Sequence, residues 1–424
     1  MSRVFKIAPT TQQYDWGRTG KSSKVAQFAS ASKYPGFVVD EVAPYAELWM
    51  GTHPKSPSTV LSSSNALSEH LASHPELIGK KIVDRFDAGS GNLPFLFKVL
   101  SIEKALSIQT HPDKKTAEEL HAQQPDIYKD PNHKPEMALA ITPFDAMCGF
   151  RPLPQIATYL RTTPEFAALI PPAISSAFLA IAGSSNPTGP EEKSALKDLF
   201  AALMTTEEFN IKYQLDILIK RYEIGQARVA DGEEPDVVEL VQKLNSQFPG
   251  DVGVFCAFVL NYVHLKPGEA IFLGAGEPHA YVSGECIECM ANSDNVIRAG
   301  LTPKLRDIPN LVSGLTYTAA PPTNHVVNPK LFTQTGASIL YNPPIPEFSV
   351  VQIKVAPGKA EVHPGVEGPS VTIVTEGSGK VAWADGELEL GLGDVFFIGA
   401  ETGVTFEGGS EGSFVLYRAF VEDN

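Results

Sequence analysis

Cysteine is scarce in this sequence. The 424 residues include four cysteines, which are Cys148, Cys256, Cys286 and Cys289. So few thiols exclude a fold that depends on a dense disulfide framework. Cys286 and Cys289 have the Cys-x-x-Cys spacing of zinc and redox pairs, but no second pair of this kind occurs in the sequence. We therefore expect all four to be buried, reduced thiols.

Long apolar runs are also missing. No uninterrupted hydrophobic stretch approaches the roughly 18 residues that a membrane-spanning helix needs. The first residues, Met1–Lys6, do not resemble a secretory signal peptide. The sequence therefore predicts a cytoplasmic protein without a membrane partner.

Positively charged residues are outnumbered by acidic ones. The sequence has 34 Lys and Arg residues against 49 Asp and Glu residues, which gives a formal net charge of −15. A surface that binds nucleic acid needs clustered cations, so we expect no nucleic-acid partner. A small anionic substrate is compatible with this charge, because a pocket can concentrate a few cations of its own.

Turn-forming and apolar residues are plentiful, with 34 glycines, 34 prolines and 43% hydrophobic residues. This composition is typical of a soluble globular protein, and the length suffices for two or three domains. Short apolar runs between turn clusters predict strands up to about residue 152 and again from Gly253 onward. Between them, over 153–252, apolar residues spaced by three and four predict an inserted helical domain.

An internal repeat occurs in the strand-rich region. Pro267–Ala275 resembles Leu392–Ala400, and each segment reads as a turn, a buried strand and a second turn. We therefore expect two related β-barrels. The first copy leads to His279, whereas the same offset of 125 residues reaches Val404 in the second copy. If the first barrel binds a metal, the second has lost a ligand and is structural.

Two polar side chains follow a buried strand at an interval of two residues. Gln109 and His111 come shortly after the apolar run Phe95–Leu100, and residues i and i+2 of a strand point to the same face. A cation held by these two residues and His279 would still lack negative charge. Glu136 offers a carboxylate at the head of another apolar strand. The four side chains are candidate metal ligands.

Six segments, which together span nearly the whole chain, resemble the type I mannose-6-phosphate isomerases of eukaryotes. They are Gln12–Gly17, Tyr45–Pro54, Ser107–Pro112, His133–Glu136, Gly284–Ala291 and Ser293–Lys304. The resemblance implies a zinc enzyme of the cupin superfamily, mainly β, with two cupin-like (jelly-roll) β-barrels and an α-helical insertion. The implied domains are a catalytic zinc-binding barrel (1–152 with 253–330), a helical insertion (153–252) and a metal-free C-terminal barrel (331–424).

The resemblance also implies a reaction and a site. The expected reaction interconverts mannose 6-phosphate and fructose 6-phosphate through an enediol, which supplies mannose for GDP-mannose synthesis and glycosylation. By the family pattern, one Zn²⁺ per monomeric chain is held by Gln109, His111, Glu136 and His279. The other expected residues are Arg298, Glu288 and Lys134 as catalytic groups, and Ser107, Lys304, Arg298, Tyr281, Asp294 and His53 as substrate-binding groups.

Three of these residues are candidates for holding the substrate's phosphate. Arg298 and Lys304 supply positive charge, the Ser107 hydroxyl is a further donor, and an arginine can bind phosphate through two parallel hydrogen bonds.

The acid/base group is expected to consist of Glu288 and Lys134. A lysine near Zn²⁺ or Arg298 can have its pKa lowered enough to act as a base. His53 or Asp294 could instead relay protons or orient the substrate. The sequence does not divide these roles.

Two other functions are compatible with the residues alone. Two histidines and a carboxylate in a cupin barrel also suit a non-haem Fe(II) oxygenase, but Gln109 would fill a coordination position that such an enzyme keeps open. A non-catalytic sugar-phosphate-binding protein is the other alternative, and the intact ligand set argues against it.

Overall fold

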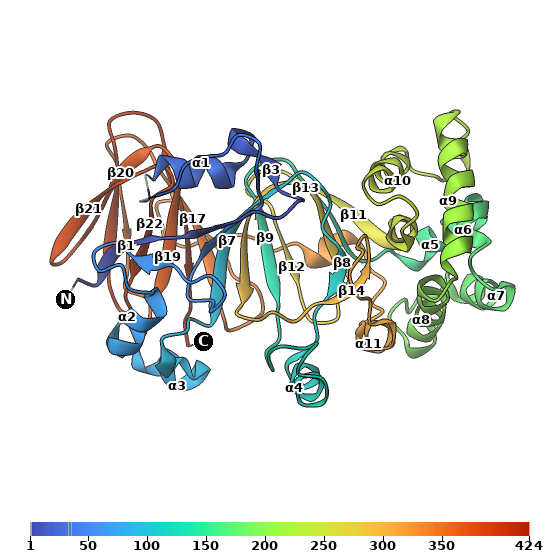
Figure 1. Ribbon diagram of the computed structural model, residues 1–424, viewed down its shortest axis with the longest axis horizontal. Helices are drawn as coiled ribbons and strands as arrows, with labels where there is room; N and C mark the ends of the chain where they lie inside the picture. Colours follow the sequence, from blue (N-terminus) through green and yellow to red (C-terminus); the bar gives the residue numbers. More distant parts are fainter. Residues whose placement is uncertain (1, 33, 35, 424) are drawn as a thin grey trace.

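The computed structural model describes residues 2–32, 34 and 36–423 of the chain. The molecule is elongated, with the C-terminal strands at one end, a large sheet in the middle and a group of helices at the other end (Figure 1). Among the described helices, none combines the length and the apolar character required to span a bilayer.

The middle of the molecule is a ten-stranded antiparallel sheet, which we call the central sheet. Its strands are β2 (Thr10–Gln12), β5 (Glu47–Met50), β7 (Phe95–Ile102), β8 (Ile108–Thr110), β9 (Glu136–Ala140), β10 (Phe144–Phe150), β11 (Leu260–Leu265), β12 (Ala270–Leu273), β13 (His279–Ala291) and β14 (Ile297–Gly300). The long β13 pairs with β7, β8, β9 and β10 and so connects the sheet. Every residue of β7 is buried, which explains its nearly continuous apolar sequence.

The C-terminal lobe contains an eight-stranded sheet and a four-stranded sheet. The eight strands are β1 (Val4–Ala8), β6 (Thr59–Val60), β15 (Lys330–Leu331), β16 (Ser338–Tyr341), β17 (Ser349–Val355), β19 (Ser370–Glu376), β22 (Val395–Ile398) and β24 (Phe414–Phe420). The four are β18 (Ala360–His363), β20 (Ser378–Trp383), β21 (Gly386–Gly391) and β23 (Val404–Gly408). A separate pair consists of β3 (Arg18–Thr19) and β4 (Pro44–Tyr45).

One buried apolar cluster contains side chains from both large sheets. Phe97 and Val99 of β7 belong to it together with Phe397 of β22 and Tyr417 of β24. Ile7 of β1, which pairs with β22, is also a member. The central sheet and the C-terminal lobe therefore share a hydrophobic core.

The helices lie in two groups. Near the sheets are α1 (Lys24–Ala31), α2 (Leu67–Ser73), α3 (Lys80–Phe86), α4 (Lys114–Gln123) and α11 (Ile308–Gly314). At the far end of the molecule are α5 (Leu153–Thr162), α6 (Pro164–Ala167), α7 (Pro172–Ile181), α8 (Pro190–Met204), α9 (Glu208–Glu223) and α10 (Pro235–Gln247) (Figure 1). This second group lies between β10 and β11 in the chain, as the sequence predicted. It packs in an apolar cluster that also contains residues of the central sheet, among them Ile108, Phe150 and Val282.

The predicted fold class is confirmed as cupin-like antiparallel sheets with a helical insertion. The described strands form open sheets and no closed barrel. The predicted three-part division of the chain stays a prediction. In the structure, β1 and β6 pair within the C-terminal sheet although they lie far away in the sequence.

The strand registers extend the internal repeat beyond the segments that reveal it. Leu273 of β12 lies opposite Glu136, and its repeat partner Ile398 of β22 lies opposite Ser370. Ser370 therefore occupies the position in the C-terminal lobe that Glu136 occupies in the central sheet. Two residues after Glu136 and Ser370 come Ala138 and Thr372. Ala138 lies opposite Glu288 of β13, and Thr372 lies opposite Arg418 of β24. Arg418 thus corresponds to Glu288.

Arg418 begins a chain of buried hydrogen bonds in the C-terminal lobe. Its Nη1 donates to His363 Nδ1 at 3.1 Å, and His363 Nε2 lies 2.8 Å from Ser338 Oγ. Ser338 Oγ donates to Glu361 Oε1 at 2.7 Å. Because arginine can only donate, His363 accepts at Nδ1 and carries its proton on Nε2. A buried cation and a buried carboxylate are thereby joined through neutral groups.

Candidate functional site

Three strands bring the predicted metal ligands together. His279, the first residue of β13, lies opposite Gln109 of β8, and His111 follows β8 directly. Glu136 is the first residue of β9. The ligand atoms of His111, Glu136 and His279 all lie within 4.8 Å of one another, and all three residues are buried.

The two histidines are oriented to leave one ring nitrogen free. His111 Nδ1 lies 2.6 Å from the carbonyl oxygen of Asn295, and His279 Nδ1 lies 2.9 Å from that of Glu277. A carbonyl only accepts, so each Nδ1 carries a proton, and in the neutral form of each ring the Nε2 has a lone pair. Among the described residues, neither buried Nε2 has a hydrogen-bond partner. Both face Glu136, with 3.4 Å from each Nε2 to a carboxylate oxygen.

This arrangement fits a bound metal ion. Backbone carbonyls that fix the tautomer of a histidine are a usual outer shell of metal sites. Burial, followed by the nearby Lys134 ammonium, lowers the pKa of His111 to about 4, so its ring is neutral at neutral pH. Burial opposes ionisation of Glu136, but Lys134 at 2.8 Å and the histidines hold the pKa of Glu136 well below its ordinary value. Two imidazole nitrogens and one carboxylate are a donor set that Zn²⁺ accepts.

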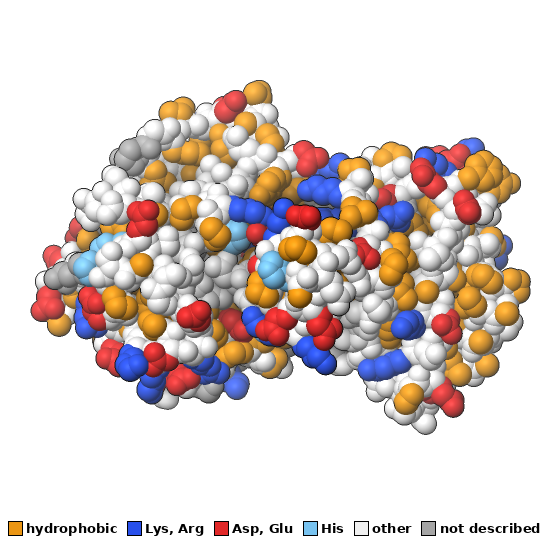
Figure 2. Space-filling view, turned by 60° about the horizontal axis from the view of Figure 1, so that its bottom comes forward, with side chains coloured by type: hydrophobic (Ala, Val, Ile, Leu, Met, Phe, Trp, Pro, Cys, Tyr) orange, Lys and Arg blue, Asp and Glu red, His pale blue; other side chains and the backbone are white. Residues whose placement is uncertain are grey.

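A pocket of about 600 Å³ opens beside these residues. Seven of the predicted site residues line it, and they are His53, Ser107, Gln109, Lys134, Asp294, Arg298 and Lys304. Glu288 and Tyr281 are buried in β13. Figure 2 shows Lys and Arg side chains gathered in a hollow of the molecular surface.

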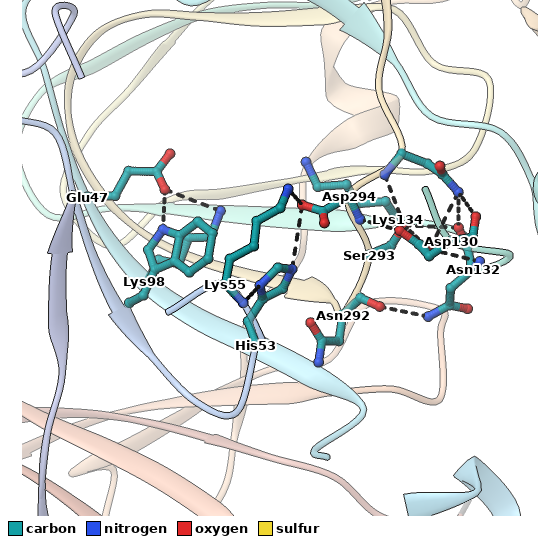
Figure 3. A network of polar contacts seen from close by, with 12 residues as sticks. Glu47, His53, Lys55, Lys98, Asp130, Asn132, Lys134, Asn292, Ser293 and Asp294 are labelled. Carbon is teal, nitrogen blue, oxygen red and sulfur yellow. Dashed lines mark hydrogen bonds and ion pairs between the residues drawn. The ribbon is translucent and has the colours of Figure 1, made fainter. Parts of the chain in front are cut away.

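Asp294 connects two basic side chains at the pocket wall. Its Oδ1 lies 2.8 Å from Lys55 Nζ and 3.5 Å from His53 Nε2 (Figure 3). The interaction with His53, supported by Lys55, holds the pKa of Asp294 well below its ordinary value although partial burial opposes this. Asp294 is therefore ionised at neutral pH and fixes both side chains.

The predicted residue Glu288 belongs to a buried charge cluster whose other members, Lys98 and Glu47, we did not predict. Lys98 Nζ is 3.0 Å from Glu288 and 3.6 Å from Glu47, and it also lies 5.2 Å from the centre of the Trp49 ring. Burial raises the pKa of Glu288, and the charges of Glu136 and Glu47 add to the increase. The sequence signal for this cluster is the lysine itself, because β7 has no other charged residue.

The cations of the pocket fall into two sets. Lys55, Lys98 and Lys134 are each paired with carboxylates. In the described part of the chain, Lys104, Arg298 and Lys304 line the same pocket without a carboxylate partner. Burial lowers the pKa of Arg298 from its ordinary value, which still leaves the guanidinium charged at neutral pH.

Lys104, Arg298 and Lys304, which have no carboxylate partner in the described part of the chain, come from adjoining segments of the fold. Arg298 of β14 pairs with Gln109 of β8, Ser107 lies just before β8, and Lys304 follows β14. Lys104 lies in the turn before Ser107. Unpaired cations in one pocket of an acidic protein form a site for an anion.

Three family models match the chain. They describe the catalytic domain of type I phosphomannose isomerase (residues 4–153), its helical insertion domain (174–260) and its C-terminal region (338–386).

Curated relatives match over almost their full length. The mannose-6-phosphate isomerases of Cryptococcus neoformans and Saccharomyces cerevisiae are 48% and 46% identical to this chain, covering 99% and 100% of it and the same shares of the relatives. The rat mannose-6-phosphate isomerase is 41% identical over 98% of each chain.

A solved structure has a similar fold. The Salmonella typhimurium mannose 6-phosphate isomerase, solved with fructose 6-phosphate and zinc bound, has a TM-score of 0.81 and 31% identity. The match covers 99% of this chain and 100% of that one.

Proposed function

This chain belongs to the type I phosphomannose isomerase family, and from that premise we propose that it interconverts mannose 6-phosphate and fructose 6-phosphate with the help of one zinc ion. The observation that carries the proposal is a pocket that adjoins a candidate metal site and is lined by cations. Its lining residues Gln109 and Lys134 contact the buried cluster of His111, Glu136 and His279, because Gln109 lies opposite His279 and Lys134 lies 2.8 Å from Glu136. Its lining also contains Arg298 and Lys304, which have no carboxylate partner among the described residues.

The zinc ligands of the proposal are His111, Glu136, His279 and Gln109. Gln109 qualifies because it pairs with His279 across two strands and lines the pocket. When bound there, zinc supplies Lewis-acid stabilisation of the negative charge that develops on the sugar oxygens.

Phosphate binding falls to Arg298, Lys304 and Ser107 in the proposal. All three line the pocket, and the two cations are not neutralised by carboxylates in the described chain. A fixed phosphate would orient C1 and C2 of the sugar toward the proposed metal ligands, and such orientation is a large part of enzymatic rate enhancement.

Proton transfer between C1 and C2 is assigned to Glu288 and Lys134 as an acid/base group. Burial raises the pKa of Glu288 above the ordinary carboxyl value, which suits a group that must gain as well as lose a proton. Lys134 lies in the pocket beside Glu136. Tyr281, His53 and Asp294 position the substrate, with Asp294 held by His53 and Lys55.

The physiological part of the proposal rests on the family resemblance. We propose that the chain acts as a cytoplasmic monomer, that the reaction passes through an enediol and that it supplies mannose for GDP-mannose synthesis.

The test combines metal content with activity. The purified chain is assayed for zinc and iron, then for isomerisation of mannose 6-phosphate before and after chelation and again after Zn²⁺ is returned. We expect about one zinc per chain and activity that is lost and regained with it. Iron in place of zinc, or zinc-loaded protein without isomerisation, would contradict the proposal.

The matched variants are His279→Ala and His264→Ala. His279→Ala should lower the zinc content, because it removes a free Nε2 from the metal set. His264 is a largely exposed histidine on β11 that pairs with Asp145, and its removal should leave the zinc content unchanged.

A further inference from the structure

Lys104 has an unusual setting for a cation of this protein. It belongs to the turn between β7 and β8, three residues before Ser107, and lines the pocket with Arg298 and Lys304. The adjacent carboxylate, Glu103, lies 3.8 Å from Arg18. Instead of a carboxylate, Lys104 Nζ meets the ring of Phe248, at 4.5 Å from the ring centre.

Phe248 belongs to the helical insertion. It follows the last residue of α10, Gln247, and its backbone nitrogen donates to Leu244 of that helix. Its half-buried ring packs against the apolar cluster that the insertion shares with the central sheet, and this packing holds the ring in place. An aromatic face attracts an ammonium group without neutralising it, which leaves the charge available to an anion.

A second contact from the insertion fixes the same turn. Gln247 Oε1 accepts a hydrogen bond of 2.9 Å from the backbone nitrogen of Ala105. The turn is also held by the carbonyl of Trp16, which accepts from the nitrogen of Lys104 at 3.2 Å, and by that of Tyr281, which accepts from Leu106 at 2.9 Å. The backbone that carries Lys104 is therefore preorganised.

We infer that Lys104 is a third cation of the phosphate-binding end of the pocket and that the helical insertion positions it through Phe248 and Gln247. The ligand class is a phosphate monoester or free phosphate. The inference rests on the proposed function for its substrate, and it gives the insertion a role in phosphate affinity. Lys104 binds the anion directly, whereas Phe248 and Gln247 act as positioning residues.

The test compares Lys104→Met, Lys104→Arg and Phe248→Leu in the zinc-loaded full chain. We measure KM and kcat for mannose 6-phosphate and the inhibition constant of inorganic phosphate. Lys104→Met should raise KM and the inhibition constant about ten-fold, the usual worth of one charge-assisted hydrogen bond, with a smaller effect on kcat. Lys104→Arg should retain most of the affinity. The control is Lys354→Met, which removes an exposed cation of β17.

Phe248→Leu should raise the same two constants about two- to five-fold, the usual worth of a cation–π contact. In the double variant with Lys104→Met, the Phe248 substitution should add nothing, because it acts through the lysine. A purely structural role of Phe248 would instead give effects that add.

Each outcome has a defined meaning. Lys104→Met with KM and phosphate inhibition within two-fold of the parent overturns the inference while the isomerase proposal stands. If only Phe248→Leu has no effect, the positioning role of the insertion is overturned. If the parent does not isomerise mannose 6-phosphate, the proposed function fails, and calorimetric titration of the parent and Lys104→Met with inorganic phosphate still decides the inference.

Discussion

Lys98 is a lysine in a strand that is buried at every residue, and its charge is matched by two buried carboxylates. Burial alone would lower the pKa of Lys98, but the charges of Glu288 and Glu47 raise it, so the ammonium form persists. The cost of burying each of these charges is offset only while the others are present.

Lys98→Met should therefore lower the free energy of unfolding by about 3–5 kcal/mol, because it leaves buried carboxylates without their cation. Urea denaturation measures the change. Adding Glu288→Gln to Lys98→Met should recover part of the loss, since the second substitution removes a charge that the first left unpaired. Equal stability of parent and Lys98→Met would contradict this account.

Ser107 offers a second prediction for a single side chain. Ser107→Asp should raise the KM for mannose 6-phosphate at least ten-fold or abolish turnover, because a carboxylate before β8 would repel the phosphate from Arg298 and Lys304. Ser107→Ala is the matched control and should have a smaller effect. Steady-state kinetics with parent-like values for Ser107→Asp would rule out this phosphate site.

Sequence reasoning found His111, Glu136 and His279, which the structure brings together, and several charged pocket residues, but it missed Lys98 and Lys104. Two local patterns helped, namely the spacing of Gln109 and His111 and the position of Glu136 at the head of a strand. Formation of the strands is enough to place these residues near one another. Lys98 contacts Glu288 and Lys104 contacts Phe248, and both partners are far away in the chain. No local sequence pattern predicts which distant residues will contact these two lysines.

At the scale of strands, the repeat shows how one layout holds two different cores. In the central sheet, Glu136 is part of a candidate metal site. At the corresponding place in the C-terminal lobe, Ser370 accepts a hydrogen bond of 2.9 Å from Arg418 Nε. The buried guanidinium of Arg418 supplies positive charge at this place in the C-terminal lobe.

The hydrogen bonds of Arg418 make the lobe sensitive to acid through His363. Burial, followed by the charge of Arg418, lowers the pKa of His363 to about 3, and Glu361 lies 4.0 Å away. In the unfolded chain the ordinary pKa is about 6.5. Between these two values the unfolded chain binds a proton that the folded chain does not. The stabilisation is therefore complete above about pH 6.5 and is lost as the pH falls.

His363→Gln should flatten this dependence. Glutamine can accept from Arg418 and donate to Ser338, but it does not titrate. The parent should lose up to about 1.4 kcal/mol more per pH unit than the variant between pH 6 and pH 4. Urea denaturation across this range measures the slopes. Parallel slopes would show that His363 does not contribute.

The strands of the repeat were predictable because each carries its own turn and apolar run. The helical insertion was predictable because its apolar residues recur at helical spacing. The pairing of β1 with β22 was not, because register between segments so far apart is decided by packing in the shared core. The registers that place Arg418 opposite Thr372 depend on the same packing.

At the scale of the whole molecule, the shared core joins the two lobes. Ile7 of β1 is fully buried in it. Ile7→Ala should lower the free energy of unfolding by about 2–5 kcal/mol, because it leaves a cavity between packed sheets. Val362→Ala is the matched control, since Val362 is 65% exposed on β18, and should change stability by less than about 0.5 kcal/mol.

The shared core also predicts that the lobes unfold together. Trp383 lies in the C-terminal lobe, whereas Trp16 and Trp49 line the pocket. Fluorescence of Trp383→Phe reports on the pocket side, and fluorescence of the Trp16→Phe/Trp49→Phe double variant reports on the C-terminal lobe. After correction for each variant's own stability by circular dichroism, both signals should follow one transition in urea. Two separate midpoints within one variant would show independent lobes.

The pairing of β1 with β22 has a consequence for how the chain is made. A ribosome releases Val4–Ala8 long before it releases Val395–Ile398, the strand that lies beside it in the finished sheet. During most of translation, the backbone groups on the edge of β1 that faces β22 therefore have no strand partner. Pairing between strands so far apart in the sequence therefore exposes the nascent chain to aggregation for longer than pairing between neighbouring strands would.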